Sequence, residues 1–255
     1  CLKSDKLKNR IDFSNFENCE EILNLIKPDI IINCAAKTNI TFCEKNKKKA
    51  YDSNAKIVEN LSFFCNENNK KLIQISTDHI YNDKKKLNIE TNHSITNYYS
   101  YSKLQGEFFA AKCNSLILRV NFFGYEKKNK IKKTLINWIL NLDKKEEYVD
   151  LYKDIYFSPL HIDTLTSIII KILSTKKIGI FNLGSTNQIR KSSFILAVAK
   201  KLKIDLNYKL VNYRDLKKSI VKRPSNMSMN VKKFQKSFSI ELPRIENEIK
   251  KIIVR

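Results

Sequence analysis

The segment TNYYSYSKLQGE, residues 96–107, places three tyrosines just ahead of one lysine. Residues four apart on a helix share one face, and only Tyr99 stands four residues before Lys103. A lysine ammonium beside a phenol favours the phenolate and lowers the tyrosine pKa from its usual value of about 10. We therefore expect Tyr99 to exchange a proton with a carbonyl or an alcohol near neutral pH. The same spacing also occurs in surface pairs that have no chemical role.

Two other candidate groups follow apolar runs. In ISTDHIY, Thr77 comes directly after the run KLIQIS, where its hydroxyl either holds the oxygen that Tyr99 protonates or caps the turn. In NCAAKT, Ala35 and Ala36 would let a flat ligand lie against the backbone, with Thr38 in hydrogen-bond reach. The alternative for these alanines is tight packing between a strand and a helix.

The elements that must position these residues alternate along the chain. Continuous apolar runs predict strands at residues 29–34, 71–76 and 115–119, and apolar residues at helical spacing predict helices over about 43–68 and 98–112. Such strands, separated by helices, favour an α/β fold with a doubly wound parallel sheet. Ligands bind such sheets at the carboxyl ends of the strands. After about Gly124 the pattern loosens, and we expect a smaller lobe over that edge of the sheet.

Composition argues against two classes of protein, nucleic-acid-binding and membrane-spanning. The formal net charge is +22, but only seven of the 48 basic residues are arginine, the preferred reader of bases, and no nucleic-acid-binding signature appears. A lysine-rich composition without a nucleic-acid partner explains the charge better than salt-sensitive DNA or RNA binding. The sequence contains no apolar run of about 18 residues, so we expect no membrane span. The six cysteines form no C-x-x-C pair, and we expect buried free thiols in a reducing cytoplasm.

Three longer segments carry a resemblance to a known family. KPDIIINCAAKTNITFCEKNKKKAYDSNAKIVENL, LIQISTDHIYND and YSYSKLQGE, in this order and spacing, resemble the extended short-chain dehydrogenases/reductases, and most of all the dTDP-4-dehydrorhamnose reductase family. The similarity continues through LRVNFFG, DIYFSPLHIDTL, GIFNLGS and KRPSNMSMNVKKF, so it covers nearly the whole chain.

The resemblance implies a fold and a reaction. It implies a Rossmann-type NAD(P)-binding domain over residues 1–124 and a mainly substrate-binding α+β lobe over 125–255, interleaved with the first. It implies reduction of a 4-keto-6-deoxy sugar nucleotide for surface polysaccharide precursors, with NADP(H) or NAD(H) as cofactor. It also implies a cytoplasmic homodimer. Magnesium at a dimer contact occurs in some relatives, although no carboxylate cluster in this sequence supports it.

The resemblance also implies roles for single residues. The catalytic residues would be Thr77, Tyr99 and Lys103. The cofactor would contact Asp12, Phe13, Ala35, Ala36, Thr38, Tyr99 and Lys103. The substrate would contact Thr77, Asn121 and Arg223.

One family feature is missing from the sequence. The four glycines, at positions 106, 124, 179 and 184, cannot form the family's N-terminal G-x-x-G-x-x-G loop. We expect that loop and the first strand to lie upstream of Cys1, and we expect marginal stability for this chain alone. Natural loss of the loop is the alternative. Two other functions stay open: an epimerase or dehydratase of the same superfamily, and a non-catalytic cofactor-binding regulatory subunit.

Overall fold

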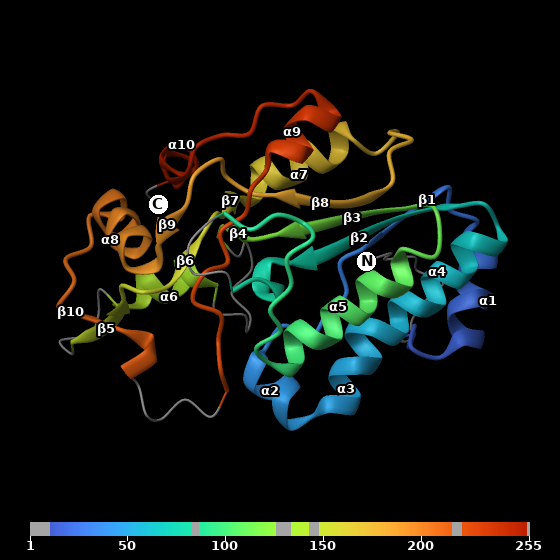
Figure 1. Ribbon diagram of the computed structural model, residues 1–255, viewed down its shortest axis with the longest axis horizontal. Coiled ribbons are helices and arrows are strands. Elements are labelled where there is room, and N and C mark those ends of the chain that lie inside the picture. Colours follow the sequence, from blue (N-terminus) through green and yellow to red (C-terminus); the bar gives the residue numbers. More distant parts are fainter. Residues whose placement is uncertain (1–10, 83–86, 126–133, 143–147, 216–220, 254–255) are drawn as a thin grey trace.

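A computed structural model describes residues 11–82, 87–125, 134–142, 148–215 and 221–253 (Figure 1). Its main sheet has four parallel strands in the order β1-β2-β3-β8. Their bounds are Ile30–Asn33 (β1), Lys71–Thr77 (β2), Ser115–Val120 (β3) and Gly179–Leu183 (β8). The three strands expected in the first half are confirmed to within one residue at each end. The fourth strand comes from the part of the chain after residue 125, so both predicted parts build this sheet.

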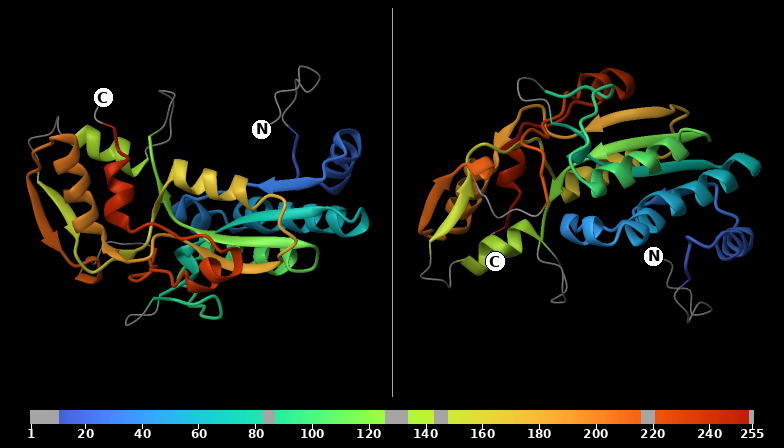
Figure 2. Two further views of the ribbon diagram at one scale, coloured as in Figure 1. Left: turned by 90° about the horizontal axis from the view of Figure 1, so that it is seen from above. Right: turned by 60° about the horizontal axis from the view of Figure 1, so that its bottom comes forward.

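Helices cover both faces of the sheet (Figures 1 and 2). On one face lie α1 (Phe16–Ile26), α4 (Ile57–Glu67) and α5 (Tyr98–Ala110), and on the other α7 (Ile162–Lys171) and α9 (Lys232–Phe238). Neighbouring residues of β2 alternate between the two layers: Leu72 packs in a core with Val58 of α4, and Ile73 in a core with Phe234 of α9. The doubly wound α/β prediction is confirmed, because apolar side chains leave each strand toward both helical layers.

The helix expected over residues 43–68 is broken near its start. The observed order is α2 (Ile40–Lys45), α3 (Lys47–Tyr51), a π-helical stretch η1 (Asp52–Lys56) and then α4. The break falls at Asn46, whose backbone leaves the helical region with φ −127° and ψ 62°. Its side-chain amide donates to the carbonyl of Phe42 at 3.0 Å. Asparagine competes with helical backbone pairing in this way, so apolar periodicity alone missed the break.

A smaller group of elements lies at the end toward which the arrows of β2 and β3 point (Figure 1). It contains α6 (Leu135–Leu142), α8 (Lys191–Leu202), α10 (Ile245–Lys250) and three short strand pairs. The pairs are β5 (Val149–Tyr152) with β10 (Tyr208–Val211), β6 (Tyr156–Phe157) with β9 (Ile189–Arg190), and β4 (Phe122–Phe123) with β7 (Leu160–His161). Their shared core includes Phe194, Ile139 and Leu151. None of the helices within the described ranges has the length and apolar character needed to cross a membrane.

Candidate active site

The site forms where β2 ends and α5 begins. Thr77 is the last residue of β2, and its hydroxyl accepts the backbone N–H of His79 at 3.2 Å, which caps the short 3-10 helix η2 (Asp78–Ile80). Asn97 caps α5 by accepting the N–H of Ser100 at 3.0 Å, so Tyr99 falls in the first helical turn. Tyr99 and Thr77 are both buried here, and the Thr77 side chain is near enough to act on the pKa of Tyr99. The fold therefore brings the two residues that were expected to share one substrate oxygen into the same site.

The three tyrosines of the motif have different surroundings. Tyr99 is buried, and its ring meets the His79 ring edge-on with centroids 5.5 Å apart. Tyr98 and Tyr101 pack against each other instead, with ring centroids 5.3 Å apart, and Tyr101 is 41% exposed. Helical spacing thus selected the tyrosine that faces the interior.

The expected lowering of the Tyr99 pKa is wrong. Burial raises the pKa of Tyr99 above its ordinary value, and the neighbouring Thr77 hydroxyl offsets this only in part. The Lys103 ammonium is buried as well and donates to the carbonyl of Ile75 at 2.8 Å. Burial lowers the pKa of Lys103 to about 8, against the opposing field of the Glu107 carboxylate. Desolvation dominates both groups, because both lie between α5 and the sheet.

A buried carboxyl group lies beside Thr77. Asp78 is 1% exposed, and its Oδ1 lies 3.4 Å from the Thr77 hydroxyl, which donates to it. The side-chain amide of Asn121 donates to Oδ2 of the same carboxyl group. Burial raises the pKa of Asp78 to about 7, while the hydrogen bond from Asn121 acts in the opposite direction. Asn121, expected at the substrate, is thus a direct partner of Asp78.

Two basic side chains from distant parts of the chain act on Asp78 and on its neighbour His79. Lys191, the first residue of α8, favours the ionised form of Asp78 and interacts with Arg223. Both cations, together with burial as the main cause, lower the pKa of His79 to about 4. Arg223 is exposed, so its guanidinium lies at the rim of the site. Among the described residues, nothing hydrogen-bonds to the buried Nδ1 of His79.

The chain after β1 presents small, accessible residues beside Lys103. Ala35 and Thr38 are exposed and Ala36 is half-buried, which favours the flat-ligand alternative for Ala35 over tight packing. The Asn33 side chain shapes this stretch: its oxygen accepts the N–H of Ala35 at 3.0 Å. The thiol of Cys34 and the ammonium of Lys103 interact electrostatically, so the stretch borders the buried end of Lys103.

The thiols only partly match the expectation of burial. Cys19, Cys43 and Cys65 are buried free thiols, as expected, but Cys113 is half-buried and Cys34 is exposed. Cys34 follows the last residue of β1, where the chain leaves the sheet, and this explains its exposure. Cys1 lies outside the described residues.

Asp12 and Phe13 lie just before α1. The exposed Asp12 carboxylate accepts the N–H and the hydroxyl of Ser14 at 2.9 and 2.7 Å, and these bonds lower the pKa of Asp12. The carbonyl of Phe13 accepts the side-chain amide of Asn60 at 2.9 Å, and its ring packs on the core under α4. Among the described residues, no hydrogen bond or ion pair joins Asp12 or Phe13 to Thr77, Tyr99 or Lys103. Their place at an adenine ring stays a prediction.

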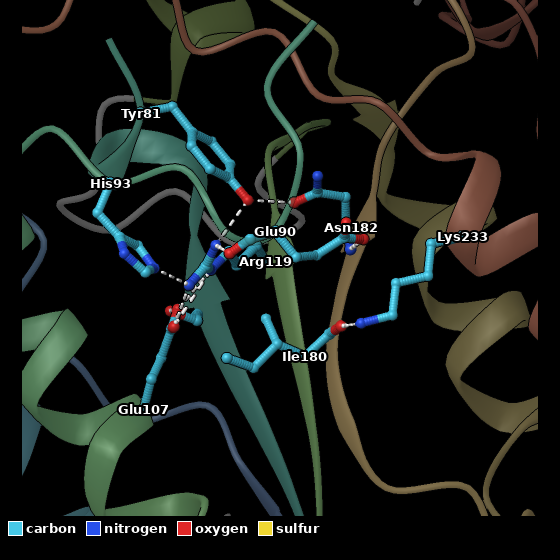
Figure 3. A network of polar contacts seen from close by, with 9 residues as sticks. Tyr81, Glu90, His93, Glu107, Arg119, Ile180, Asn182 and Lys233 are labelled. Atoms are coloured by element: carbon cyan, nitrogen blue, oxygen red, sulfur yellow. Dashed lines mark hydrogen bonds and ion pairs between the residues drawn. The ribbon is translucent and has the colours of Figure 1, made fainter. Parts of the chain in front are cut away.

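A buried polar network that sequence reasoning missed supports α5 (Figure 3). Arg119 of β3 is fully buried and pairs with Glu107 of α5 at 2.7 Å. Its Nη1 donates to the Tyr81 hydroxyl at 2.7 Å, and that hydroxyl donates to Asn182 of β8 at 2.7 Å. The hydroxyl of Ser76 also donates to Glu107. Glu107 stood in the quoted motif, but nothing in the sequence gave its partner 12 residues later.

Among the described residues, no group of three or more His, Cys, Asp or Glu side chains could hold a metal ion. The donors gathered at the site are hydroxyls, an ammonium and one carboxyl group, which suit hydrogen bonding and proton transfer.

A parallel α/β sheet, with a tyrosine and a lysine of one helix beside a hydroxyl at the carboxyl end of a strand, defines a reductase of the extended short-chain dehydrogenase/reductase class. Residues 4–255 match the family described as RmlD substrate binding domain. The chain belongs to that family.

Individual relatives agree with this assignment. The chain is 29% identical over 258 residues to dTDP-4-dehydrorhamnose reductase of Escherichia coli (strain K12), covering 95% of this chain and 84% of that protein. A crystal structure of a hypothetical dTDP-4-dehydrorhamnose reductase from Sulfolobus tokodaii superposes with a TM-score of 0.83 at 27% identity, covering 96% of this chain and 86% of that one. The Bacillus anthracis dTDP-4-dehydrorhamnose reductase in complex with NADP superposes with a TM-score of 0.86 at 23% identity, covering 94% and 85%.

Proposed function

We propose that this protein is an NAD(P)H-dependent reductase of a 4-keto-6-deoxy sugar nucleotide of the dTDP-4-dehydrorhamnose kind, serving surface polysaccharide precursor synthesis. One observation carries the proposal: the buried side chains of Tyr99 and Thr77 interact at the carboxyl end of β2, with Lys103 one helical turn further along α5. The curated relatives named dTDP-4-dehydrorhamnose reductase support the substrate class.

The residues around Lys103 fit a nicotinamide cofactor. The ammonium has three donors, and the bond to the Ile75 carbonyl uses one of them. The accessible stretch of Ala35, Ala36 and Thr38 gives a flat ring room against the backbone. NADP is the cofactor in the Bacillus anthracis structure. When bound, a reduced nicotinamide supplies the hydride, and the protein's residues bind, orient and protonate.

The raised pKa of Tyr99 suits the reductive direction. A phenol with a raised pKa keeps its proton at neutral pH, so it can act as an acid. As hydride reaches C4 of the sugar, negative charge develops on O4, and the Tyr99 proton moves to that oxygen. Thr77 holds the same oxygen by a hydrogen bond. The Lys103 ammonium, with a pKa of about 8, is charged at neutral pH and stabilises the phenolate left on Tyr99.

The test follows loss of reduced-nicotinamide absorbance on adding dTDP-4-keto-6-deoxy sugar. We expect Tyr99→Phe to lower kcat by roughly 10²- to 10⁴-fold, the range for removal of a general acid, with NADPH binding retained. Tyr101→Phe is the matched control, because its exposed side chain lies two residues away on the same helix, and it should keep full activity. Equal activity of Tyr99→Phe and wild type would reject the assigned role.

The same assay separates the alternatives. Stoichiometric loss of reduced cofactor, one per sugar reduced, supports the reductase. Sugar conversion without net cofactor oxidation would favour an epimerase or a dehydratase. Cofactor binding without any conversion would favour a regulatory subunit. Retention of Thr77, Tyr99 and Lys103 at the junction of β2 and α5 argues for catalysis.

The proposal extends to assembly, cellular location and domain organisation. We infer a homodimer in the cytoplasm. The five free thiols among the described residues suit a reducing compartment. We also divide the chain into a cofactor part, residues 1–124, and a mainly substrate-binding part, residues 125–255, which returns β8 to the first part's sheet.

A further inference from the structure

The hydroxyl of Thr77 has one proton to donate, and two acceptors compete for it. Its oxygen already accepts the backbone N–H of His79 at 3.2 Å. Its proton points to Oδ1 of Asp78, at 3.4 Å between the oxygens. The proposed reaction asks the same proton to hold the substrate oxygen. A hydroxyl donates only once, so an ionised Asp78 competes with the substrate for Thr77.

The surroundings of Asp78 define where a proton on its carboxyl group would lie. Oδ2 accepts the side-chain amide of Asn121, so only Oδ1 is directed at Thr77. A neutral carboxyl group would keep the Asn121 bond on Oδ2 and donate from Oδ1 to the Thr77 oxygen. That oxygen has two lone pairs and uses one of them to accept the N–H of His79, so it has room for this bond.

Charged and titratable groups reach Asp78 from three elements. Lys191 at the start of α8 favours the ionised form. Tyr99 on α5 is neutral at ordinary pH and interacts with the carboxylate unfavourably when ionised. His79 on η2 is neutral near pH 7, since its pKa is about 4, and Arg223 acts on His79 and on Lys191. Burial, the largest influence, raises the Asp78 pKa to about 7, which makes both forms accessible near neutral pH.

We propose that Asp78 is a positioning residue of the reduction, and that its neutral form donates to the Thr77 oxygen and thereby frees the Thr77 proton to hold the substrate oxygen. The ionised form accepts the hydrogen bond from Thr77, so the Thr77 proton is no longer available to hold the substrate oxygen and the site is inactive. Asp78 keeps its proton throughout turnover, so the balance of the reaction is unchanged. This inference rests on the proposed function and adds a control by protonation to it.

Asp78→Asn gives the sharpest test. The Asn oxygen can accept from Asn121 while its amide nitrogen donates to Thr77, which imitates the neutral acid at every pH. For the wild type, we expect kcat/KM to fall above pH 7 and to be roughly tenfold below its plateau at pH 8, as one ionisation requires. Asp78→Asn should lose this falling limb of the pH profile and stay active at pH 8. A limb near pH 8 from Lys103 would remain in both proteins.

Lys191→Met tests the same group without touching it. Removing the cation disfavours the ionised form, so the limb should move to higher pH. Lys201→Met is the matched control, since Lys201 is exposed on the same helix, and it should leave the limb in place. An unchanged limb in Asp78→Asn, or loss of its activity at every pH with a native melting temperature, would overturn the inference.

A second readout needs no turnover. In protein labelled with ¹³C at aspartate carboxyl groups, the resonance missing from the Asp78→Asn spectrum belongs to Asp78. We expect it to titrate near pH 7 in wild type and higher in Lys191→Met, and a midpoint below pH 5 would overturn the inference. If Asp78→Asn does not fold, Lys191→Met decides by its pH profile and by the shift of the one carboxyl resonance that titrates near pH 7. A titration as expected in a protein that oxidises no cofactor would reject the proposed function alone.

Discussion

At the scale of single residues, the site depends on polar groups taken out of water. Tyr99, Lys103 and Asp78 are all buried, and burial favours the neutral form of each. Tyr99 thereby holds its proton near neutral pH, Asp78 exchanges its proton there, and Lys103 releases its proton more easily than an ordinary lysine. Environment, more than residue type, sets these three roles.

Lys103→Met should weaken NADPH binding. Hydrogen bonds to a charged group contribute about 1.5–3 kcal/mol, so we expect the Kd to rise roughly 10- to 150-fold. Fluorescence titration with NADPH measures this directly. Lys112→Met, an exposed lysine just beyond α5, should bind as wild type does. For wild type, affinity should fall as pH rises through about 8, because Lys103 then loses its charge. A pH-independent Kd between pH 7 and 9 would contradict this role.

At the scale of elements, α5 is placed by contacts at both of its sides. One side meets η1, where the Asn54 side chain donates to the hydroxyl of Ser102 at 2.9 Å. The other meets β3 through Glu107 and Arg119 (Figure 3). A helix held on both sides keeps Tyr99 at a defined distance from the end of β2.

Gly106→Ala should disturb this placement. A Cβ at position 106 would lie 2.3 Å from the backbone carbonyl oxygen of Asn54, so α5 and η1 must separate. Overpacking of this kind costs about 1–3 kcal/mol. For a chain of this size, roughly 2–4 °C of melting temperature is lost per kcal/mol.

Thermal unfolding followed by circular dichroism measures the Gly106→Ala effect. Gln105→Ala is the control, since its half-buried side chain is shortened on the same helix without entering that contact. A Gly106→Ala melt equal to that of wild type would show that the close approach to Asn54 is not needed.

At the scale of the whole molecule, the +22 charge acts on stability more than on chemistry. Several ion pairs, such as Lys48–Asp52 and Lys56–Glu59, lie on the surface, where each contributes little. Repulsion among the unpaired lysines therefore opposes the compact state.

We expect the melting temperature to rise between about 10 and 300 mM NaCl, because the Debye length falls from roughly 30 Å to well below 10 Å. An uncharged osmolyte at equal osmolality serves as the control for general solvent effects. A melting temperature that falls with added NaCl would mean that ion pairs outweigh the repulsion. The same melts test the expected marginal stability, which a cooperative high-temperature transition would contradict.

The sequence by itself determined the features that depend on short stretches of chain. Apolar runs located β1, β2 and β3, and helical spacing picked Tyr99 from three tyrosines, since both patterns repeat within a few residues. The motif of Thr77, Tyr99 and Lys103 was readable for the same reason.

Only the tertiary structure decided the features that depend on contacts between distant segments. It brought Lys191 to Asp78 across 113 positions and buried Arg119 against Glu107. It also reversed the expected shift of the Tyr99 pKa. The physical reason is that desolvation and the local field are sums over all neighbours in space, and a pattern along the chain contains only the neighbours in sequence.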